Sequence, residues 1–390
     1  MLMKKRTIGF ITVARSDYNT IKPVYERAAH FPGLEPQLYV TGIHLSPEFG
    51  STIQDIRKDG IPIAETVDMV LSSDSPSAIA KTMGLGTICF AQLFEKQRPD
   101  ILVIAGDRLE MHCVASAAVP FKIPITHLRG GEVTHGAIDD NFRHSLTKMS
   151  HLHFVAHESF AKRIRQLGEE PWRVFVSGDP GLDLIERMTF PNKNELERTY
   201  SIDLSKPTLL ITFHPVTLEY EQTALYTDNL LKALAIFKDR VHFVFTYPNS
   251  DTYGRVIIQK INAFCNSVPM AFFIKNFGQS GYYGMMRCAA AMVGNSSSGI
   301  WESGSFQIPV VNIGKRQGGR LRPANVVDVN ESTTDITQGI EKALSDSFRQ
   351  SLTSVQNPYS LPGACDFIVK KLSEVPLDGH LIIKKFHDLA

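Results

Sequence analysis

The most informative stretch of the chain is the apolar run Ile-Leu-Val-Ile-Ala at 101–105, which is followed at once by Gly-Asp-Arg with Asp107 and Arg108. Five apolar residues are typical of a strand buried on both faces, and open α/β sheets place their ligands at the carboxyl ends of such strands. A carboxylate beside a guanidinium at that point could transfer protons and bind an anion. The alternative is that Asp107 only caps the helix that begins at Leu109.

A second strand of the same kind, over 123–127, runs into a loop and a helix that are rich in ionisable groups. The i, i+4 spacing of Asp139 and Arg143 places them on one helical face, where they could pair; a plain surface ion pair is the alternative. Two consecutive strands that deliver carboxylates to one sheet edge predict an active site that does acid/base chemistry. The candidate catalytic residues are Asp107, Glu132, Asp139, Asp140 and Arg143, together with His214 of the second half.

A metal centre is not expected in the first half of the chain. His127, Glu132 and His135 do not match a zinc-binding spacing. The cluster of His151, His153 and His157 alternates as the residues of a strand would, which favours a structural role.

The second half carries a serine-rich turn between a buried strand and a helix, Met-Val-Gly-Asn-Ser-Ser-Ser-Gly at 292–299. Unpaired backbone amides at a helix N-terminus bind phosphate well, and Ser296 and Ser297 add hydroxyl donors. Glu302, about one turn into the helix, could accept hydrogen bonds from a ribose diol. The alternative is a serine N-cap followed by a Glu that complements the helix dipole.

Four further loops follow predicted strands and supply candidate ligands. The turn after the first strand carries Arg15 and Asp17, and it lacks the Gly-x-Gly-x-x-Gly pattern of a nicotinamide or flavin site. An arginine there is better suited to a diphosphate. His214 could donate to a phosphate oxygen, although a solvated loop histidine is the commoner case. The loops of Asn249 and Phe277 offer amides and aromatic rings that could hold a nucleobase.

Alternating strands and helices must position these residues. The sequence predicts strands over 7–13, 35–40, 101–105, 123–127, 153–156 and 174–176, and a second series over 208–213, 241–246, 271–274, 289–293 and 309–311. The fold class is therefore α/β, with two Rossmann-like domains facing a central cleft. We expect the first domain over 1–185 and the second over 200–364, with a C-terminal helix of about 365–390 as a candidate to pack back on the first.

The composition excludes several classes of function. The 390 residues carry a net charge of +1 and no basic stripe, which argues against a nucleic-acid partner. The five cysteines are scattered, as in proteins of a reducing cytosol. We expect no signal peptide and no apolar run of membrane-spanning length, hence a cytoplasmic protein without a membrane partner.

On these residues the chain resembles the UDP-N-acetylglucosamine 2-epimerase family, whose members have the two-domain GT-B architecture. Within the family it is most similar to the hydrolysing branch that starts sialic-acid-type biosynthesis. That branch is marked by Arg-Ala/Ser-Asp-Tyr after the first strand, as at 15–18, and by the Gly-Gly-Glu-Val and Ile-Asp-Asp-x-x-Arg-His runs. One departure is Trp301, where relatives carry a smaller or basic residue.

The resemblance implies a UDP-sugar substrate, no cofactor and no metal, and a homodimer or homotetramer. It implies that UDP is held by Arg15, His214, Ser296, Ser297, Glu302 and Arg316, to which the loop patterns add Asp17, Asn249 and Phe277. It also implies that the five acid and arginine candidates of the first half surround the sugar.

The implied reaction has two steps. A base removes the C2 proton while the bond from C1 to UDP breaks, which gives a 2-acetamidoglycal; water then adds to C1 and a proton returns to C2 from the opposite face. Asp107 and Glu132 are the leading acid/base pair, with Asp139 or Asp140 as an alternative partner. The competing hypotheses are a non-hydrolysing UDP-sugar 2-epimerase, a GT-B glycosyltransferase and a binding protein without turnover. The donor is open between UDP-N-acetylglucosamine and a UDP-2,4-diacetamido-trideoxyhexose.

Overall fold

The computed structural model of the chain describes residues 5–47, 52–73, 75–135, 138–183, 185, 188–216, 218–248 and 253–388. The chain folds into two compact units, each built on its own parallel sheet. Unit 1 comprises Met1–Glu132, Asp139–Arg187 and Tyr359–Ala390, and unit 2 comprises Val133–Ile138 and Met188–Pro358. The fold class predicted from the sequence, α/β with two Rossmann-like sheets, is confirmed.

The sheet of unit 1 has seven strands in the order β3-β2-β1-β4-β5-β6-β7, all paired in parallel. Their bounds are β1 Arg6–Thr12, β2 Leu34–Thr41, β3 Ile63–Val67, β4 Ile101–Ala105, β5 Ile125–Leu128, β6 Leu152–Val155 and β7 Val174–Val176. The order reverses between β1 and β4. Ligands of doubly wound sheets bind at the carboxyl ends of the two strands at such a reversal, and the residues after these two strands include Arg15 and Asp107.

Helices cover both faces of this sheet. Along β4, Val103 belongs to one apolar cluster and its neighbours Leu102 and Ile104 to another, because successive side chains of a strand point to opposite faces. The helices are α1 Arg15–Ala29, α2 Ile53–Lys58, α3 Pro76–Lys96, α4 Leu109–Ala118, α5 Asp139–Met149, α6 Glu158–Gln166, α7 Pro180–Asp183, α16 Ala364–Glu374 and α17 Gly379–Ile382, with the 3₁₀ turns η1 Gly42–Leu45 and η3 Pro171–Arg173.

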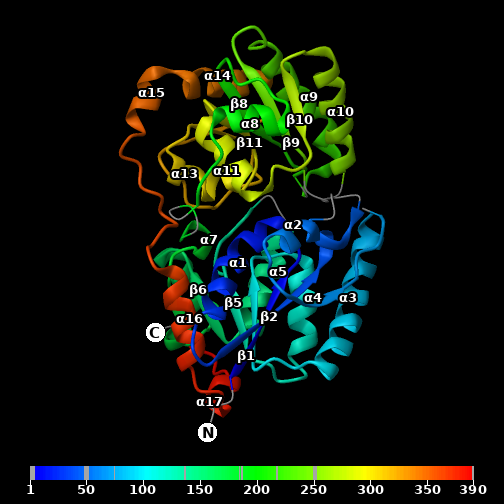
Figure 1. Cartoon of the computed structure of the whole chain (residues 1–390), viewed down its shortest axis with the longest axis vertical. Helices are drawn as coiled ribbons and strands as arrows, with labels where there is room; N and C mark the ends of the chain where they lie inside the picture. Colours follow the sequence, from blue (N-terminus) through cyan, green and yellow to red (C-terminus); the bar gives the residue numbers. More distant parts are fainter. Residues whose placement is uncertain are drawn as a thin grey trace. The chain divides into compact units, whose positions relative to one another are not determined.

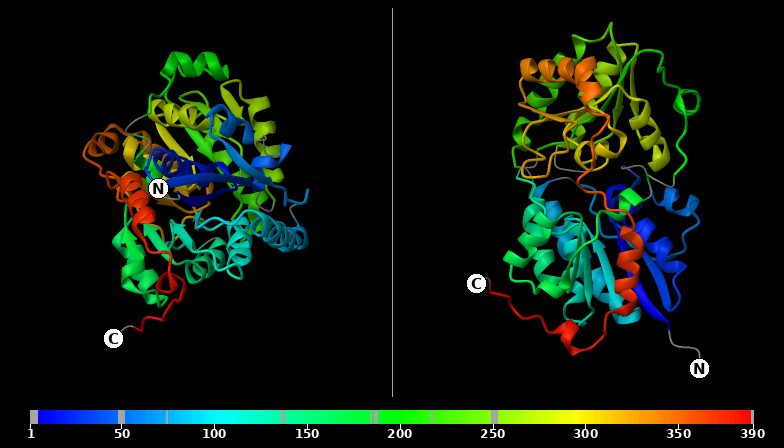
Figure 2. Two further views of the ribbon diagram at one scale, coloured as in Figure 1. Left: turned by 60° about the horizontal axis from the view of Figure 1, so that its bottom comes forward. Right: turned by 90° about the vertical axis from the view of Figure 1, so that its left-hand side faces the viewer.

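The C-terminal segment belongs to unit 1. Figure 1 shows α16 in red beside the elements of that unit, and Figure 2 shows the same segment running on into α17. Cys365, Ile368 and Leu372 join the apolar cluster of α1. The buried Arg173 guanidinium donates to the carbonyl oxygen of Leu381 at 2.8 Å. The return begins at Tyr359, where the sequence suggested about 365.

The sheet of unit 2 has six parallel strands in the order β10-β9-β8-β11-β12-β13. It reverses between β8 and β11, so the residues after these strands, His214 and the serine turn, lie at the carboxyl ends where a ligand is expected. The bounds are β8 Thr208–Thr212, β9 His242–Thr246, β10 Ala271–Ile274, β11 Ala291–Gly294, β12 Val310–Ile313 and β13 Val326–Val329. The helices are α8 Lys193–Tyr200, α9 Thr223–Ala235, α10 Gly254–Ser267, α11 Gly278–Cys288, α12 Ser298–Trp301, α13 Ser303–Phe306, α14 Thr333–Leu344 and α15 Asp346–Ser351, with the 3₁₀ turn η4 Tyr220–Gln222.

One short segment joins unit 2 although its neighbours in sequence belong to unit 1. Within Val133–Ile138, the backbone N–H of His135 donates to the carbonyl oxygen of Gly318 at 3.0 Å. A Cβ on Gly319 would lie 2.5 Å from the Val133 side chain, so the contact is close. No local sequence feature predicts that residues 133–138 pack in unit 2, because nothing in the segment marks a change of packing partner.

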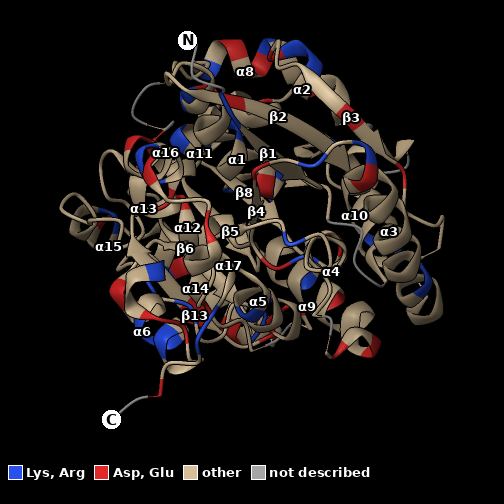
Figure 3. Cartoon of the chain, turned by 90° about the horizontal axis from the view of Figure 1, so that it is seen from below, with Lys and Arg blue, Asp and Glu red and all other residues tan. Residues whose placement is uncertain are grey.

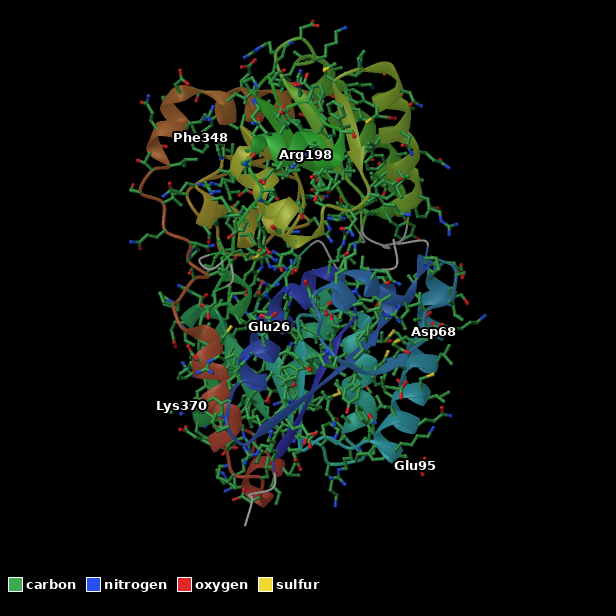
Figure 4. The ribbon with its side chains drawn as sticks, in the orientation of Figure 1. Glu26, Asp68, Glu95, Arg198, Phe348 and Lys370 are labelled. Atoms are coloured by element: carbon green, nitrogen blue, oxygen red, sulfur yellow. The ribbon has the colours of Figure 1, made fainter. Side chains whose placement is uncertain are left out.

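The expectation that no apolar run reaches membrane-spanning length is wrong for one segment. By length and composition, the helix α3 could span a membrane. Core helices of soluble proteins meet the same criterion. In the structure α3 packs on α4 and buries a stripe that includes Phe90 and Leu93. Glu95, in its last turn, is exposed (Figure 4).

Acidic and basic residues are spread over many elements of the two units rather than collected on one of them (Figure 3). This distribution agrees with the small net charge of the sequence. Over the part of the chain that the structure describes, it offers no basic stripe of the kind that tracks a nucleic-acid backbone.

Candidate active site

The turn between β1 and α1 is shaped by the carboxylate of Asp17, a residue that is 5% exposed. This carboxylate accepts hydrogen bonds from the Thr12 hydroxyl at 2.7 Å and from the backbone N–H groups of Val13 at 2.9 Å and Ala14 at 2.7 Å. Burial raises the pKa of Asp17 to about 7 although these hydrogen bonds oppose the rise. The arrangement favours a role in shaping the turn over the nucleotide contact that the sequence predicted. Arg15, on the same turn, is partly exposed.

A buried histidine extends this chain of hydrogen bonds. His44 Nε2 lies 2.9 Å from the Thr12 hydroxyl oxygen, and His44 Nδ1 lies 2.7 Å from that of Thr52. Because the Thr12 proton goes to Asp17, His44 donates from Nε2 and accepts from Thr52 at Nδ1. Burial lowers the pKa of His44 to about 3, so the ring is neutral. The turn that carries Arg15 therefore rests on a fixed buried network.

Arg143 bonds to three of the predicted catalytic residues of unit 1. From α5, its Nη2 donates to Oδ2 of Asp107, which follows β4, and its Nη1 donates to Oδ1 of Asp140. Nη1 also donates to the backbone oxygen of Glu132, which follows β5, at 3.3 Å. An ion pair on α5 thus joins Arg143 to Asp140, three residues back, because positions three residues apart neighbour one another on a helix. The i, i+4 pairing of Arg143 with Asp139 stays a prediction.

These groups differ in how far their side chains are exposed to solvent. The Arg143 side chain is 1% exposed, whereas those of Asp107 and Asp140 are 21% and 23% exposed. A buried guanidinium needs its carboxylate partners, and they in turn are held in fixed orientations by its planar donors. Glu132 is buried. The arrangement can present oriented carboxylates to a substrate, which is the requirement for acid/base catalysis.

His127 supports the turn that carries Asp107. Its Nε2 donates to the carbonyl oxygen of Gly106 at 2.7 Å, and burial lowers its pKa to about 4, so the ring is neutral. Among the residues that the structure describes, no group of three or more His, Cys, Asp or Glu side chains could hold a metal ion. His153 belongs instead to a buried network with Glu169, at 3.3 Å.

In unit 2, the side chain of Asn295 is bonded to the backbone of His214 in both directions. Asn295 Oδ1 accepts from the His214 N–H at 2.7 Å, and Asn295 Nδ2 donates to the His214 carbonyl oxygen at 2.8 Å. The backbone oxygen of Asn295 accepts from Arg316 Nη1 at 3.1 Å and from Gln317 Nε2 at 2.8 Å. The predicted ligands His214 and Arg316 are thus brought to one residue of the turn that carries the serines.

The serine turn does not behave as a simple cap. Ser297 stands at the N-cap position of α12, yet its hydroxyl makes no capping hydrogen bond. Ser296 Oγ accepts a long hydrogen bond, 3.4 Å, from the Ser298 N–H, and Ser298 Oγ lies 2.5 Å from the Tyr282 hydroxyl. Glu302 stands where α12 ends and α13 begins, so the predicted single helix is two short ones.

Of the two residues that were expected to hold the nucleobase, Phe277 lies within the described part of the chain. Phe277 is buried, with its ring centroid 4.5 Å from that of Tyr200 and its carbonyl oxygen accepting from the Tyr200 hydroxyl at 2.6 Å. One part of this ring is therefore already covered within the unit. Asn249 lies outside the described residues.

Sequence reasoning missed the residues that position the site. Asn295, Gln317, Tyr282 and His127 hold the turns named above, and none of them was predicted to do so. Asn295 stands inside the Gly-Asn-Ser-Ser-Ser motif, which could have marked it. No comparable signal exists for Tyr282, whose partner Ser298 is 16 residues away.

The chain matches known proteins over nearly its whole length. A family model described as UDP-N-acetylglucosamine 2-epimerase matches residues 26–373. The chain is 41% identical to a GDP/UDP-N,N'-diacetylbacillosamine 2-epimerase (hydrolyzing) of Campylobacter jejuni, covering 99% of this chain and 100% of the relative. It is 33% identical to the polysialic acid biosynthesis protein P7 of Escherichia coli, covering 99% and 98%.

A solved structure has the same fold. The UDP-GlcNAc 2-epimerase from Neisseria meningitidis, crystallised with UDP-GlcNAc, superposes with a TM-score of 0.80 at 17% identity, over 94% of this chain and 99% of that one. At this identity the likeness supports the fold, whereas the family model and the full-length relatives establish the family. The chain belongs to the UDP-N-acetylglucosamine 2-epimerase family, in the branch of the hydrolysing 2-epimerases.

Proposed function

We propose that the chain converts a UDP-2-acetamido sugar and water into the free 2-epimer and UDP. The observation that carries this proposal is that the Arg143 guanidinium, at the strand ends of unit 1, bonds to the carboxylates of Asp107 and Asp140 and to the backbone oxygen of Glu132. Acid/base chemistry at C2 needs such oriented carboxylates. Family membership supplies the substrate class.

The reaction balances in two steps. A carboxylate takes the C2 proton, the C2–H electron pair becomes the C1=C2 double bond, and the C1–O pair leaves with UDP. Water then adds its oxygen to C1 while C2 gains a proton from an acid on the opposite face; one water proton stays on the new C1 hydroxyl and the other is taken up by a base. We assign the two proton transfers to Asp107 and Glu132, because they come from separate loops and could serve opposite faces. Asp139 and Asp140 are the alternatives for either role.

The departing diphosphate requires positive charge and N–H or O–H donors. His214, Ser296, Ser297 and Arg316 of unit 2, with Arg15 of unit 1, are the groups that we propose for this role, and Glu302 is proposed for the ribose. Oriented donors stabilise developing charge without reorganising during the reaction. Phe277 and Asn249 are kept as proposed nucleobase contacts, and Asp17 as a residue that acts by shaping the turn of Arg15.

We propose a UDP-2,4-diacetamido-trideoxyhexose as the preferred donor. The relative at 41% identity and one of two relatives at 33% are named for diacetylbacillosamine, whereas the other at 33% is named for polysialic acid. The two donors differ at C4 and C6, so they separate cleanly in a substrate panel. We expect kcat/KM to be higher for UDP-N,N'-diacetylbacillosamine than for UDP-N-acetylglucosamine.

The test is proton NMR of both donors incubated with the protein in D₂O. The expected result is free UDP and a free 2-epimer that carries deuterium at C2. A product that stays attached to UDP would indicate a non-hydrolysing epimerase. Transfer to an added acceptor with hydrogen kept at C2 would indicate a glycosyltransferase, and either result would overturn the proposal.

Two expectations from the sequence stay predictions. Light scattering of the purified protein checks the homodimer or homotetramer, and fractionation of cells that produce it checks the cytoplasmic location.

A further inference from the structure

We propose that Asn295 is a positioning residue that sets the spacing of three loops of unit 2 and so builds the cradle for the diphosphate of the nucleotide sugar. The inference rests on the proposed function, because it takes UDP as the ligand of these loops. Asn295 itself need not touch the substrate. It acts through His214, the serine turn and Arg316.

Every polar group of Asn295 is used to join these loops. Its backbone N–H donates to the Thr212 carbonyl oxygen at 3.1 Å, and its side-chain amide bonds twice to the backbone of His214. Its carbonyl oxygen accepts from Arg316 and Gln317. Asn295 is 0% exposed. A buried amide whose oxygen and nitrogen are both bonded to one neighbour holds that neighbour in one arrangement, because any shift leaves a polar group unpaired.

The reach of Asn295 follows from the register of the sheet. Gly294 pairs with Thr212 in the last backbone rung between β11 and β8. Gly294 has a φ of +138°, and a Cβ there would lie 2.0 Å from the Thr212 carbonyl oxygen, so the strands approach more closely than a side chain allows. One residue further on, the Asn295 side chain makes the next pair of hydrogen bonds, to the backbone N–H and carbonyl oxygen of His214.

The neutrality of this clamp suits an anionic ligand. An aspartate could also accept from the His214 N–H, but it would add a negative charge beside the phosphates and could not donate to the His214 carbonyl. The amide holds the loop without a charge. Because preorganised donors cost no reorganisation when the diphosphate leaves, errors in their spacing reduce binding and rate together.

A second buried asparagine in the same unit provides a matched control. Asn325 is also 0% exposed, and its Nδ2 donates to Ser303 Oγ at 2.9 Å and to the Ile308 carbonyl oxygen at 2.6 Å. It precedes β13 and therefore lies at the amino edge of the sheet, away from the strand ends that carry His214 and the serines. Asn295→Ala and Asn325→Ala each remove a buried amide, and only the first removes it from the cradle.

The experiment compares uridine and UDP as competitive inhibitors of UDP-sugar turnover, with UDP affinity also measured by calorimetry, which needs no turnover. For Asn295→Ala we expect the inhibition constant of UDP to rise about 10- to 100-fold, as expected for about two lost hydrogen bonds, while that of uridine stays unchanged. For Asn325→Ala we expect a lower melting temperature and an unchanged ratio of UDP to uridine affinity. Both variants are measured at a temperature where they are folded.

The outcomes separate the inference from the proposed function. Wild-type protein that binds UDP, with Asn295→Ala weakening UDP and uridine equally or weakening neither, would overturn the positioning role alone. A shift of the UDP to uridine ratio in Asn325→Ala as large as in Asn295→Ala would also overturn it. Wild-type protein that does not bind UDP would overturn both the role and the proposed function.

Discussion

The two units organise the same edge of a doubly wound sheet by opposite means. In unit 1 the turn after β4 is joined to α5 by charge, since the buried Arg143 guanidinium bonds to Asp107 and Asp140. At the reversal in unit 2 the loops are joined by the neutral amide of Asn295, which bonds to the backbone of His214. The first six strands of the unit 1 sheet follow the same order as the six strands of unit 2, so the difference lies in the loops and not in the fold.

This difference matches the two tasks that we propose. Carboxylates that transfer protons must be held close together, and a buried cation offsets their mutual repulsion. A diphosphate cradle needs the reverse, because any carboxylate used as a clamp would repel the ligand. The comparison predicts that changes at the carboxylates of unit 1 reduce turnover, whereas changes at the serine turn of unit 2 reduce nucleotide affinity.

The largest expected effect is on chemistry in unit 1. Asp107→Asn and Glu132→Gln keep shape but cannot act as bases, so turnover should fall about 10²- to 10⁴-fold. UDP affinity, measured by calorimetry, should stay near wild type. Glu158→Gln, at an exposed acid of α6, is the control and should change neither. The division of tasks fails if UDP binding falls in proportion to rate.

A smaller effect is expected on nucleotide affinity in unit 2. Ser297→Ala and Glu302→Ala each remove one proposed charge-assisted hydrogen bond to UDP, which should cost about 1.5–3 kcal/mol of binding free energy. Ser332 is a true cap, since its Oγ accepts from the Asp335 N–H at 3.1 Å. Ser332→Ala should therefore lower stability and leave UDP affinity unchanged. The same pattern in Ser297→Ala would show that the serine turn is only a cap.

The next prediction concerns the pH dependence of stability through Asp17. Its pKa is about 7 in the folded chain and 3.8 in a free side chain, so the folded state binds the proton more tightly. The resulting stabilisation is complete at low pH and is lost as the pH rises through about 7. Between pH 4 and pH 7 this loss is on the order of 1–4 kcal/mol in the free energy of unfolding.

Asp17→Asn removes this titration, and its free energy of unfolding in urea should fall less steeply over the same pH range than that of the wild type. Asp366→Asn, at an exposed carboxylate of α16, controls for the loss of one acid. Parallel pH profiles for wild type and Asp17→Asn would contradict the assignment.

The smallest expected effect is that of a chelator. The proposed roles need carboxylates, N–H groups and hydroxyls, so EDTA should leave turnover unchanged. Loss of turnover that a divalent ion restores would mean that a metal replaces part of the charge that we assign to Arg15, His214 and Arg316.

Local sequence patterns predicted the buried strands and the loops that follow them. The apolar run at 101–105 predicted a buried strand because a parallel strand covered on both faces is continuously apolar. The motifs after the strands predicted where ligands meet the chain, because parallel strands present their carboxyl ends at one edge. From these two facts the fold class and the identities of the Arg143 cluster followed.

Tertiary structure alone decided which of those residues are buried and hold the others in place, and which are exposed to a substrate. Arg143 pairs with Asp107, 36 residues away, and Asn295 pairs with His214, 81 residues away. Asp17 turned out to be enclosed by its own turn, and residues 133–138 to belong to the other unit. Local sequence sets the spacing of apolar residues, which distinguishes helices from strands, and it sets the turns between them. The partner of a buried polar group is chosen by whichever distant donor or acceptor the folded chain brings within hydrogen-bonding distance, because leaving such a group unpaired costs more than any local preference gains.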